Sequence, residues 1–367
     1  MSTSVKILVV GNYSNFISAR PEAEIYLSLA SKGFQIEIIT DITSEYAKRF
    51  KAAGISIIDH TPKKKISKAT IKLFKETLSK GKHDAFVLYN SKAITNGLIA
   101  AKNINTKVIL YRGCAGHISW LDPTMYFKYL NKRVDHIICN AKSAQSLFEK
   151  QLTFDNKKAI TIHKGHDVKW YEDVPNEALD QFNVPDDAFV VCCVANARPV
   201  KGVQYLLKAF NALPVDYPIF LLLMGNGHDT KKHLSIIRNC PNKDKIKLLG
   251  FRKDSLAIVK SSNCFVLPSI GQETLTKSVI ESMCVETTPI ITNVAGNKAL
   301  VKHNESGLIV PVKDSAAIAR AIMDLYKNSE KNNQLATSAK KRIEQTLSHS
   351  QTVTDYSNFF RSLKKHY

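Results

Sequence analysis

The sequence alternates short, continuous apolar runs with segments of helical periodicity, and it does so in two successive series. The first series opens at residues 5–10 (VKILVV), and a helical pattern over 21–32 then leads to a second apolar run at 35–40. The second series opens at residues 189–195. Unbroken apolar runs are typical of strands buried on both faces of a parallel sheet. We therefore expect an α/β chain with two doubly wound sheets, each covered by helices on both faces.

The first series continues with further predicted elements, which are strands over 55–59, 84–89 and 107–111 and helices over 68–80 and 96–103. In doubly wound sheets, ligands bind at the carboxyl ends of the strands. The loops after Val10, Tyr89 and Tyr111 are therefore expected to contact a ligand. Gly11 opens the first of these loops and is assigned to ligand binding.

Length and composition indicate an ordinary globular protein of two domains, with 367 residues of which 44% are hydrophobic. No apolar run approaches the ~20 residues that cross a bilayer, and the first residues lead directly into a strand. We therefore expect a cytoplasmic protein. The seven cysteines fall mostly in apolar segments, as expected for small core residues in a reducing compartment.

The net charge of +20 is concentrated in the first half of the chain. Residues 1–170 carry 27 Lys and Arg against 13 Asp and Glu, and a cluster lies at Lys63, Lys64 and Lys65 and along the helix that follows. Such a face attracts anionic lipid head groups or an acidic acceptor, and a merely solvated face is the alternative. The chain has no aromatic-interleaved basic motif, so a nucleic-acid partner is not expected.

Residues 268–289 (PSIGQETLTKSVIESMCVETTP) carry the most specific pattern in the chain. A short apolar run and a Gly-containing loop precede a helix whose N-terminus would suit a phosphate. Glu273 stands just before this helix and Glu281 lies eight residues later, roughly 12 Å away along a helix axis. That distance is similar to the one from the sugar to the ribose of a nucleotide sugar. The alternative is two solvent-facing carboxylates on a surface helix.

This segment resembles the Glu-x7-Glu signature of retaining glycosyltransferases of family four. The resemblance implies a GT-B fold, with two Rossmann-like domains facing each other across a cleft. It also implies that Glu273 contacts the donor sugar, that the backbone at Leu275 and Thr276 holds the β-phosphate, and that Glu281 binds the ribose. This chain has Thr274-Leu275-Thr276 where the family has Gly-Phe-Gly, and Glu286 where it has Gly.

The turn after the strand at 189–195 reads NARPVKG. The family places an Arg and a Lys at this turn, where fixed cations stabilise the leaving diphosphate. The resemblance assigns this role to Lys201. The family's Arg position holds Asn196 here, and Arg198 is offset by two residues. An exposed lysine at a helix start is the alternative for Lys201.

Three further residues are assigned by the same resemblance. Gly225 begins a Gly-x-Gly turn, Arg252 lies where the family holds the nucleobase, and His117 lies in the loop after Tyr111, near the donor sugar. A helix-capping histidine and a solvated arginine are the alternatives for His117 and Arg252.

The domain boundaries follow from the same pattern. An acceptor-side domain is expected over residues 1–168, a linker over 169–185 and a nucleotide-sugar-binding domain over 186–351, with a final helix over 352–367 crossing back to the first domain.

The expected function is transfer of a sugar from a nucleoside diphosphate sugar to a hydroxyl of an anionic or lipid-linked glycan, in bacterial polysaccharide or lipopolysaccharide synthesis. The protein is expected to act in the cytoplasm, at the inner face of the plasma membrane, without a metal or other cofactor, because there is no Asp-x-Asp motif. Two alternatives are a nucleotide-sugar epimerase on the same fold and a non-catalytic glycan-binding protein.

Overall fold

The computed structural model describes residues 4–114, 116, 118–151 and 156–364. The chain divides into two compact units. The first contains Met1–Gly165 and His349–Tyr367, and the second contains His166–Ser348.

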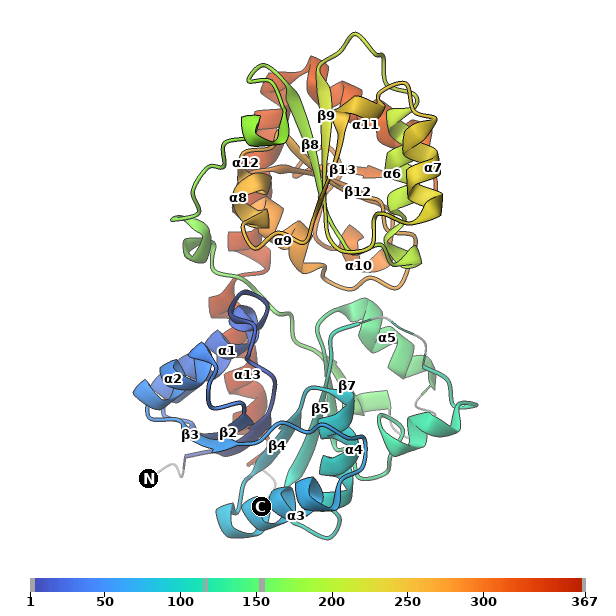
Figure 1. Ribbon diagram of the computed structural model, residues 1–367. Coiled ribbons are helices and arrows are strands. Elements are labelled where there is room, and N and C mark those ends of the chain that lie inside the picture. The colour runs from blue at the N-terminus through green and yellow to red at the C-terminus, as the bar shows by residue number, and fades with distance from the viewer. Residues whose placement is uncertain (1–3, 115, 117, 152–155, 365–367) are drawn as a thin grey trace. The chain divides into compact units, whose positions relative to one another are not determined.

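The first unit is built on a parallel seven-stranded sheet in the order β3-β2-β1-β4-β5-β6-β7 (Figure 1). Its strands are β1 Lys6–Val10, β2 Gln35–Thr40, β3 Ser56–Asp59, β4 Ala85–Leu88, β5 Lys107–Arg112, β6 His136–Cys139 and β7 Ala159–Thr161. Its helices are α1 Phe16–Ser31, α2 Glu45–Ala52, α3 Lys68–Gly81, α4 Ser91–Ala100, α5 Lys142–Gln151 and α13 His349–Ser362. Apolar clusters fill both faces of this sheet, as the unbroken apolar runs predict.

Helix α13 follows the second unit in sequence, yet it packs against α1 in the first unit. The buried face of α13 includes Tyr356 and Phe360, which join the same apolar cluster as Tyr26 and Leu29 of α1. Helix α13 is therefore part of the first unit, although it follows the second unit in sequence.

Two helix boundaries differ from the sequence-based prediction. Helix α4 was expected over 96–103 but begins at Ser91, because the Asn90 side chain accepts hydrogen bonds from the backbone N–H groups of Lys92 and Ala93. Helix α1 begins at Phe16, five residues before the expected start at Pro21, because Asn15 caps it. In both cases the capping asparagine, rather than the apolar periodicity, sets the first turn.

The second unit holds a parallel six-stranded sheet in the order β10-β9-β8-β11-β12-β13 (Figure 1). Its strands are β8 Phe189–Val194, β9 Ile219–Met224, β10 Ile246–Gly250, β11 Cys264–Leu267, β12 Thr288–Thr292 and β13 Leu308–Val310. Its helices are α6 Val203–Phe210, α7 Lys231–Arg238, α8 Ser255–Lys260, α9 Lys277–Cys284, α10 Ala295–Lys298, α11 Ser315–Lys327 and α12 Ser329–Thr346. Both units are thus doubly wound sheets, as predicted.

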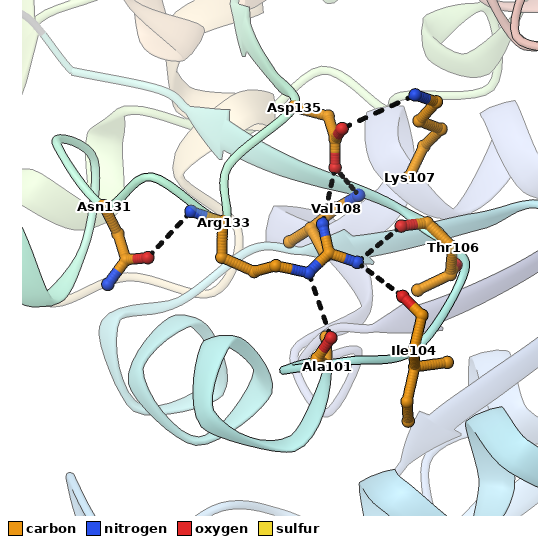
Figure 2. Close-up of polar contacts among 8 residues, drawn as sticks. All are labelled: Ala101, Ile104, Thr106, Lys107, Val108, Asn131, Arg133 and Asp135. Atoms are coloured by element: carbon orange, nitrogen blue, oxygen red, sulfur yellow. Dashed lines mark hydrogen bonds and ion pairs between the residues drawn. The ribbon is translucent and has the colours of Figure 1, made fainter.

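Arg133 fastens helix α4 to the starts of β5 and β6 in the first unit (Figure 2). Its guanidinium donates hydrogen bonds to the backbone carbonyls of Ala101, Ile104 and Thr106 at 2.9, 3.0 and 2.6 Å, and to the Asp135 carboxylate at 2.7 Å. The planar fork of an arginine suits such a multiple contact, which a lysine cannot reproduce.

We predict that Arg133→Met lowers the free energy of unfolding of the chain by about 2–4 kcal/mol, because three carbonyls and a carboxylate lose their donor. Lys107→Met is the matched control. Lys107 also pairs with Asp135, but at 3.6 Å and with a side chain 36% exposed, so its loss should change stability by less than about 1 kcal/mol. Urea denaturation followed by circular dichroism measures both. Equal losses in the two variants would contradict the role given to Arg133.

Candidate active site

The strand order of the second unit reverses between β8 and β11. Strand β8 lies next to β9 on one side and β11 on the other, and the chain builds outward in both directions from this pair. Loops that leave the carboxyl ends of two such strands separate from each other and open a crevice, which is the usual ligand site of a doubly wound sheet. The loops concerned are 195–202 after β8 and 268–276 after β11. They carry Lys201 and Glu273.

Close backbone contacts fix these two loops against each other. The N–H of Ile270 donates to the carbonyl of Val200 at 2.8 Å. Gly202 has a φ of +63°, and a Cβ there would lie less than 3.0 Å from the carbonyl oxygen of Pro268. Only glycine fits, both for its backbone conformation and for the space. The Thr292 hydroxyl also donates to the carbonyl of Ser269, which ties the second loop to the end of β12.

Lys201 and Glu273 form an ion pair at 2.7 Å between Nζ and Oε1, and their side chains are only 9% and 11% exposed. The carboxylate has two further donors. The Ser269 hydroxyl reaches Oε1 at 2.9 Å, and the Thr276 hydroxyl reaches Oε2 at 2.9 Å. Both carboxylate oxygens are therefore held in place, and the orientation of Glu273 is set by the loop that carries it.

Helix α9 begins at Lys277, with Thr276 as the residue before its first turn. Since the sequence pattern expects the helix to start just after Glu273, Leu275 is expected to lie on it. It precedes the helix instead, with a side chain 8% exposed. Thr276 makes no capping hydrogen bond to α9, because its hydroxyl contacts Glu273 and the Asn297 side chain, 2.7 Å away. The N–H of Val279 donates to the Thr276 carbonyl at 3.1 Å, but no side chain caps the N–H groups of Lys277 and Ser278. Uncapped N–H groups in a first helical turn can bind an anion.

Glu281 lies on the first turns of α9 and forms an ion pair with Lys277 four residues earlier. The Glu281 side chain is 16% exposed and the Lys277 side chain 33% exposed. A second carboxylate therefore stands on the same helix as the anion-binding turn, with a cation beside it.

Three other predicted residues lie on the loops after β8 and β9, at the carboxyl edge of the same sheet. The Asn196 side chain accepts a hydrogen bond from the backbone N–H of Asn226 at 3.0 Å, which joins the β8 and β9 loops. Gly225 has a φ of +133° and approaches the carbonyl of Ala195 too closely for any side chain. Arg198 is exposed at the start of the turn that leads to Lys201. Asn196 and Gly225 thus shape the backbone, while Arg198 presents a solvent-facing cation.

Arg252 follows β10 and is fixed by local contacts. It donates to the Asp254 carboxylate, at 2.8 Å from Nε, and its guanidinium lies 5.2 Å from the ring centre of Phe182. The Asp254 carboxylate raises the pKa of Arg252 and the guanidinium lowers the pKa of Asp254, each through their shared hydrogen bonds. Arg252 is therefore a positioned planar group rather than a freely solvated one.

The predicted residues of the first unit divide into two cases. Gly11 is buried, and a Cβ there would lie 2.7 Å from the ring of Tyr13, so this glycine makes room for a core side chain. His117 lies outside the described residues. Arg112, at the start of the same loop, donates to the carbonyls of Cys114 and Gly116 at 2.8 and 2.9 Å and thereby holds that loop.

Sequence patterns did not single out Ser269, Asn297 or Gly296 as site residues. Gly296 lies at the start of α10, where a Cβ would be less than 3.0 Å from the carbonyl oxygens of Glu273 and Thr274. Asn297 reaches Thr276 across 21 residues. Neither contact has a local signal, since both depend on β11 and β12 lying side by side. Ser269 could have been identified from the sequence, because a hydroxyl four residues before a glutamate in a tight loop is well placed to donate to the carboxylate.

Two buried histidines adjoin the Gly225 turn. His228 donates from Nε2 to the carbonyl of Ala195 at 2.6 Å, and its ring stacks on His233 at 5.7 Å between ring centres. Burial lowers the pKa of both imidazoles, and the pKa of His233 is lowered further because a protonated His228 would repel a second proton. Both rings are therefore neutral in the folded unit at neutral pH.

Comparison with known proteins shows which family model and which solved folds this chain resembles. Residues 175–342 match the family model of glycosyl transferases group 1. A galactosyltransferase of Escherichia coli, described as UDP-Gal:alpha-D-GlcNAc-diphosphoundecaprenol alpha-1,3-galactosyltransferase, is 26% identical over 272 residues, which are 70% of this chain and 69% of that protein. Other curated relatives are matched over only 55%, 42% and 60% of their own length.

Solved structures of similar fold cover nearly the whole chain. A glycosyltransferase from Rickettsia africae superposes with a TM-score of 0.83 at 16% identity and covers 100% of both chains. Anabaena HepE in complex with UDP and glucose superposes with a TM-score of 0.78 at 17% identity, over 98% of this chain and 100% of that one. These neighbours confirm the predicted GT-B fold class.

We predict that Gly296→Ala disturbs the Glu273 loop, because the added methyl group clashes with two backbone carbonyls. The free energy of unfolding should fall by about 1–3 kcal/mol, as in other overpacked sites. Gly271→Ala is the matched control in the same loop, since a Cβ there meets nothing within 4 Å. Thermal and urea unfolding measure both variants. A stable Gly296→Ala protein would show that the loop has room to move.

We also predict that the chain loses stability as the pH falls below about 6.5, the ordinary pKa of histidine. The folded pKa values of His228 and His233 are lowered, so the unfolded chain binds more protons in acid and its population rises. The stability that the two neutral histidines contribute is fully present above pH 6.5. His233→Phe keeps a stacking ring without a titrating group, and its stability should change less between pH 7.5 and 5.5. An unchanged pH dependence would contradict this assignment.

Proposed function

We propose that this chain, whose residues 175–342 match the family model of glycosyl transferases group 1, transfers a sugar from a nucleoside diphosphate sugar to a hydroxyl of a glycan or lipid-linked acceptor, with retention at the anomeric carbon. The observation that carries the proposal is the Lys201–Glu273 pair beside the uncapped start of α9. The cation and the uncapped N–H groups match the phosphate oxygens of a sugar diphosphate. The carboxylate, held in place by its neighbours, matches the sugar hydroxyls.

The diphosphate is the leaving group, and its negative charge grows as the bond to the sugar breaks. Lys201 and the N–H groups at the start of α9 are its proposed binding partners, and the exposed Arg198 adds a second cation. Fixed donors of this kind stabilise developing charge without having to reorganise. We propose that these groups neutralise the diphosphate without a divalent metal.

Glu273 is the proposed contact for the sugar hydroxyls. A carboxylate accepts hydrogen bonds from two neighbouring hydroxyls, and Ser269 and Thr276 keep its oxygens in a defined position. When the diphosphate draws Lys201 toward itself, Glu273 gains acceptor capacity for the sugar. The acceptor hydroxyl then attacks the anomeric carbon from the face that the diphosphate leaves. Its C–O bond forms as the bond between the sugar and the diphosphate breaks, and the hydroxyl proton passes to the departing phosphate oxygen.

Glu281 and Arg252 are the proposed nucleoside contacts. Binding of the ribose hydroxyls by Glu281 requires its pair with Lys277 to open, and the released Lys277 cation would then lie near the diphosphate. Arg252, held by Asp254 and Phe182, would flank the base. Since structural neighbours bind UDP and UDP-glucose, we propose a uridine nucleotide sugar as the donor.

The acceptor proposal rests on the relatives and on charge. Besides the galactosyltransferase acting on a diphosphoundecaprenol substrate, relatives are described as capsular polysaccharide and lipopolysaccharide core glycosyltransferases. In the first unit, the buried side chain of Asn96 fixes the loop that carries exposed Lys63, Lys64 and Lys65. We propose an anionic or lipid-linked glycan acceptor met at the cytoplasmic face of an anionic membrane. Within the described ranges, no helix has both the length and the apolarity of a membrane span.

The proposal predicts that the purified chain releases UDP from a UDP-hexose in the presence of EDTA. Lys201→Met and Glu273→Gln should each lower the turnover rate about tenfold to hundredfold, as expected when a contact worth about 1.5–3 kcal/mol to the transition state is lost. Lys208→Met is the control, since Lys208 is exposed on α6 outside the site. A coupled UDP-release assay measures the rates, and thermal unfolding verifies that each variant is folded.

Two results would decide against the proposal. A wild-type chain that does not bind UDP, and releases no nucleoside diphosphate from any UDP-, GDP- or ADP-sugar, would leave only a binding role. If Lys201→Met lowers the turnover rate by less than about threefold, Lys201 does not bind the diphosphate as proposed.

A further inference from the structure

A separate cavity of about 560 Å³ lies in the second unit, between helix α12 and residues 302–306. Residues 302–306 lead directly into β13, and a Cβ on Gly307 would approach the carbonyl of Pro289 near the start of β12. The cavity is therefore at the amino edge of the parallel sheet. Lys201 and Glu273 lie at the carboxyl edge, and neither lines the cavity. Its volume is in the range of small-molecule sites, about 300–1,000 Å³.

The walls of this cavity are held together by Arg342 of α12. Its guanidinium donates to the carbonyl of Leu300 at 2.6 Å and to that of Ala299 at 3.0 Å. The loop is also fixed internally, since the N–H of Lys302 donates to the Ser306 hydroxyl at 3.0 Å and Ser306 is 3% exposed. Hydrogen bonds thus hold the backbone of the cavity walls, while most of the lining side chains are exposed to solvent.

The charges of the lining are mostly positive. Its cations are Lys302, Lys331, Lys341 and Arg342, and its one carboxylate is Glu305. Lys302 pairs with Glu305 at 3.2 Å and Lys331 pairs with Asp324 at 2.7 Å. Lys341 has no ion pair within the part of the chain that the structure describes, and Arg342 keeps its charge while binding carbonyls. The cavity therefore favours an anion.

The remaining lining indicates what kind of anion fits. Gln334, Ser338 and Gln345 contribute amide and hydroxyl groups, and Leu335 is the one apolar residue among the lining residues. No aromatic ring lines the cavity, so a nucleobase would find no stacking surface. Amides and hydroxyls are suited to the hydroxyl groups of a sugar, and the cations to a phosphate or carboxylate attached to it.

We propose that this cavity binds an anionic carbohydrate, a sugar that carries a phosphate or carboxylate, at a site separate from that of the nucleotide sugar. Two sources share this chemistry, a soluble sugar phosphate and an acidic unit within a polysaccharide. The inference goes beyond the proposed transfer reaction, because it depends on residues at the opposite edge of the sheet.

The test is calorimetric titration of the full chain with glucose 6-phosphate, glucuronic acid, a glucuronate oligosaccharide, glucose and inorganic phosphate. Glucose 6-phosphate or a glucuronate ligand should bind at least tenfold more tightly than glucose or phosphate alone. The better of the two identifies the source. Lys341→Glu should weaken this binding at least tenfold, and Lys208→Glu, which reverses a charge outside the cavity, should not. Ser338→Trp fills the cavity without changing its charge and should also abolish binding.

UDP binding is measured on the same samples. It should persist in Lys341→Glu and Ser338→Trp, while Glu281→Ala should weaken UDP binding and leave the sugar phosphate bound, so failure at one site is distinguishable from failure at the other. Absence of binding by every anionic sugar would overturn the inference. So would equal affinity for inorganic phosphate, tighter binding of an RNA oligonucleotide, or binding that Lys341→Glu leaves unchanged.

Discussion

The contact between Lys201 and Glu273 depends on most of the second unit. Two opposite charges with side chains about one-tenth exposed are stable together only if each is held close to the other and hydrogen-bonded. The pair therefore requires β8 and β11 to be adjacent, Gly202 to bring one loop against the other, and Ser269 and Thr276 to occupy the remaining positions around the carboxylate. The same requirements define a preformed place for a ligand with both hydroxyls and phosphates.

Glycines at the carboxyl edge of the second unit's sheet have a steric role, although Gly202 and Gly225 also lie in turns that resemble a ligand-binding signature. Gly202, Gly225 and Gly296 each lie against a backbone carbonyl that a Cβ would meet at less than 3.0 Å. They allow neighbouring loops to come close enough for side chains from different strands to meet. Thr274-Leu275-Thr276 stands where the resembling family has glycines, and here the added Thr276 hydroxyl takes part in holding Glu273.

The two edges of the second sheet differ in chemistry. At the carboxyl edge, both carboxylates of the candidate site are paired with a lysine, in the Lys201–Glu273 and Lys277–Glu281 pairs, and Arg198 faces solvent. At the amino edge, the cavity beside α12 has more cations than carboxylates and no counter-charge for Lys341 among the described residues. A preformed site can keep its charges paired until a ligand replaces one partner, whereas an excess of one sign attracts a ligand from solution.

The sequence by itself determined the alternation of strands and helices, the two doubly wound sheets and the resemblance to glycosyltransferases, because apolar runs and loop motifs are local patterns. It also placed Glu273 and Lys201 among the candidate residues. Only the tertiary structure decided that these two side chains touch, that Leu275 precedes α9, and that Asn297 and Gly296 support the loop. Each of these depends on strands or helices distant in sequence lying side by side, and no local pattern carries that information.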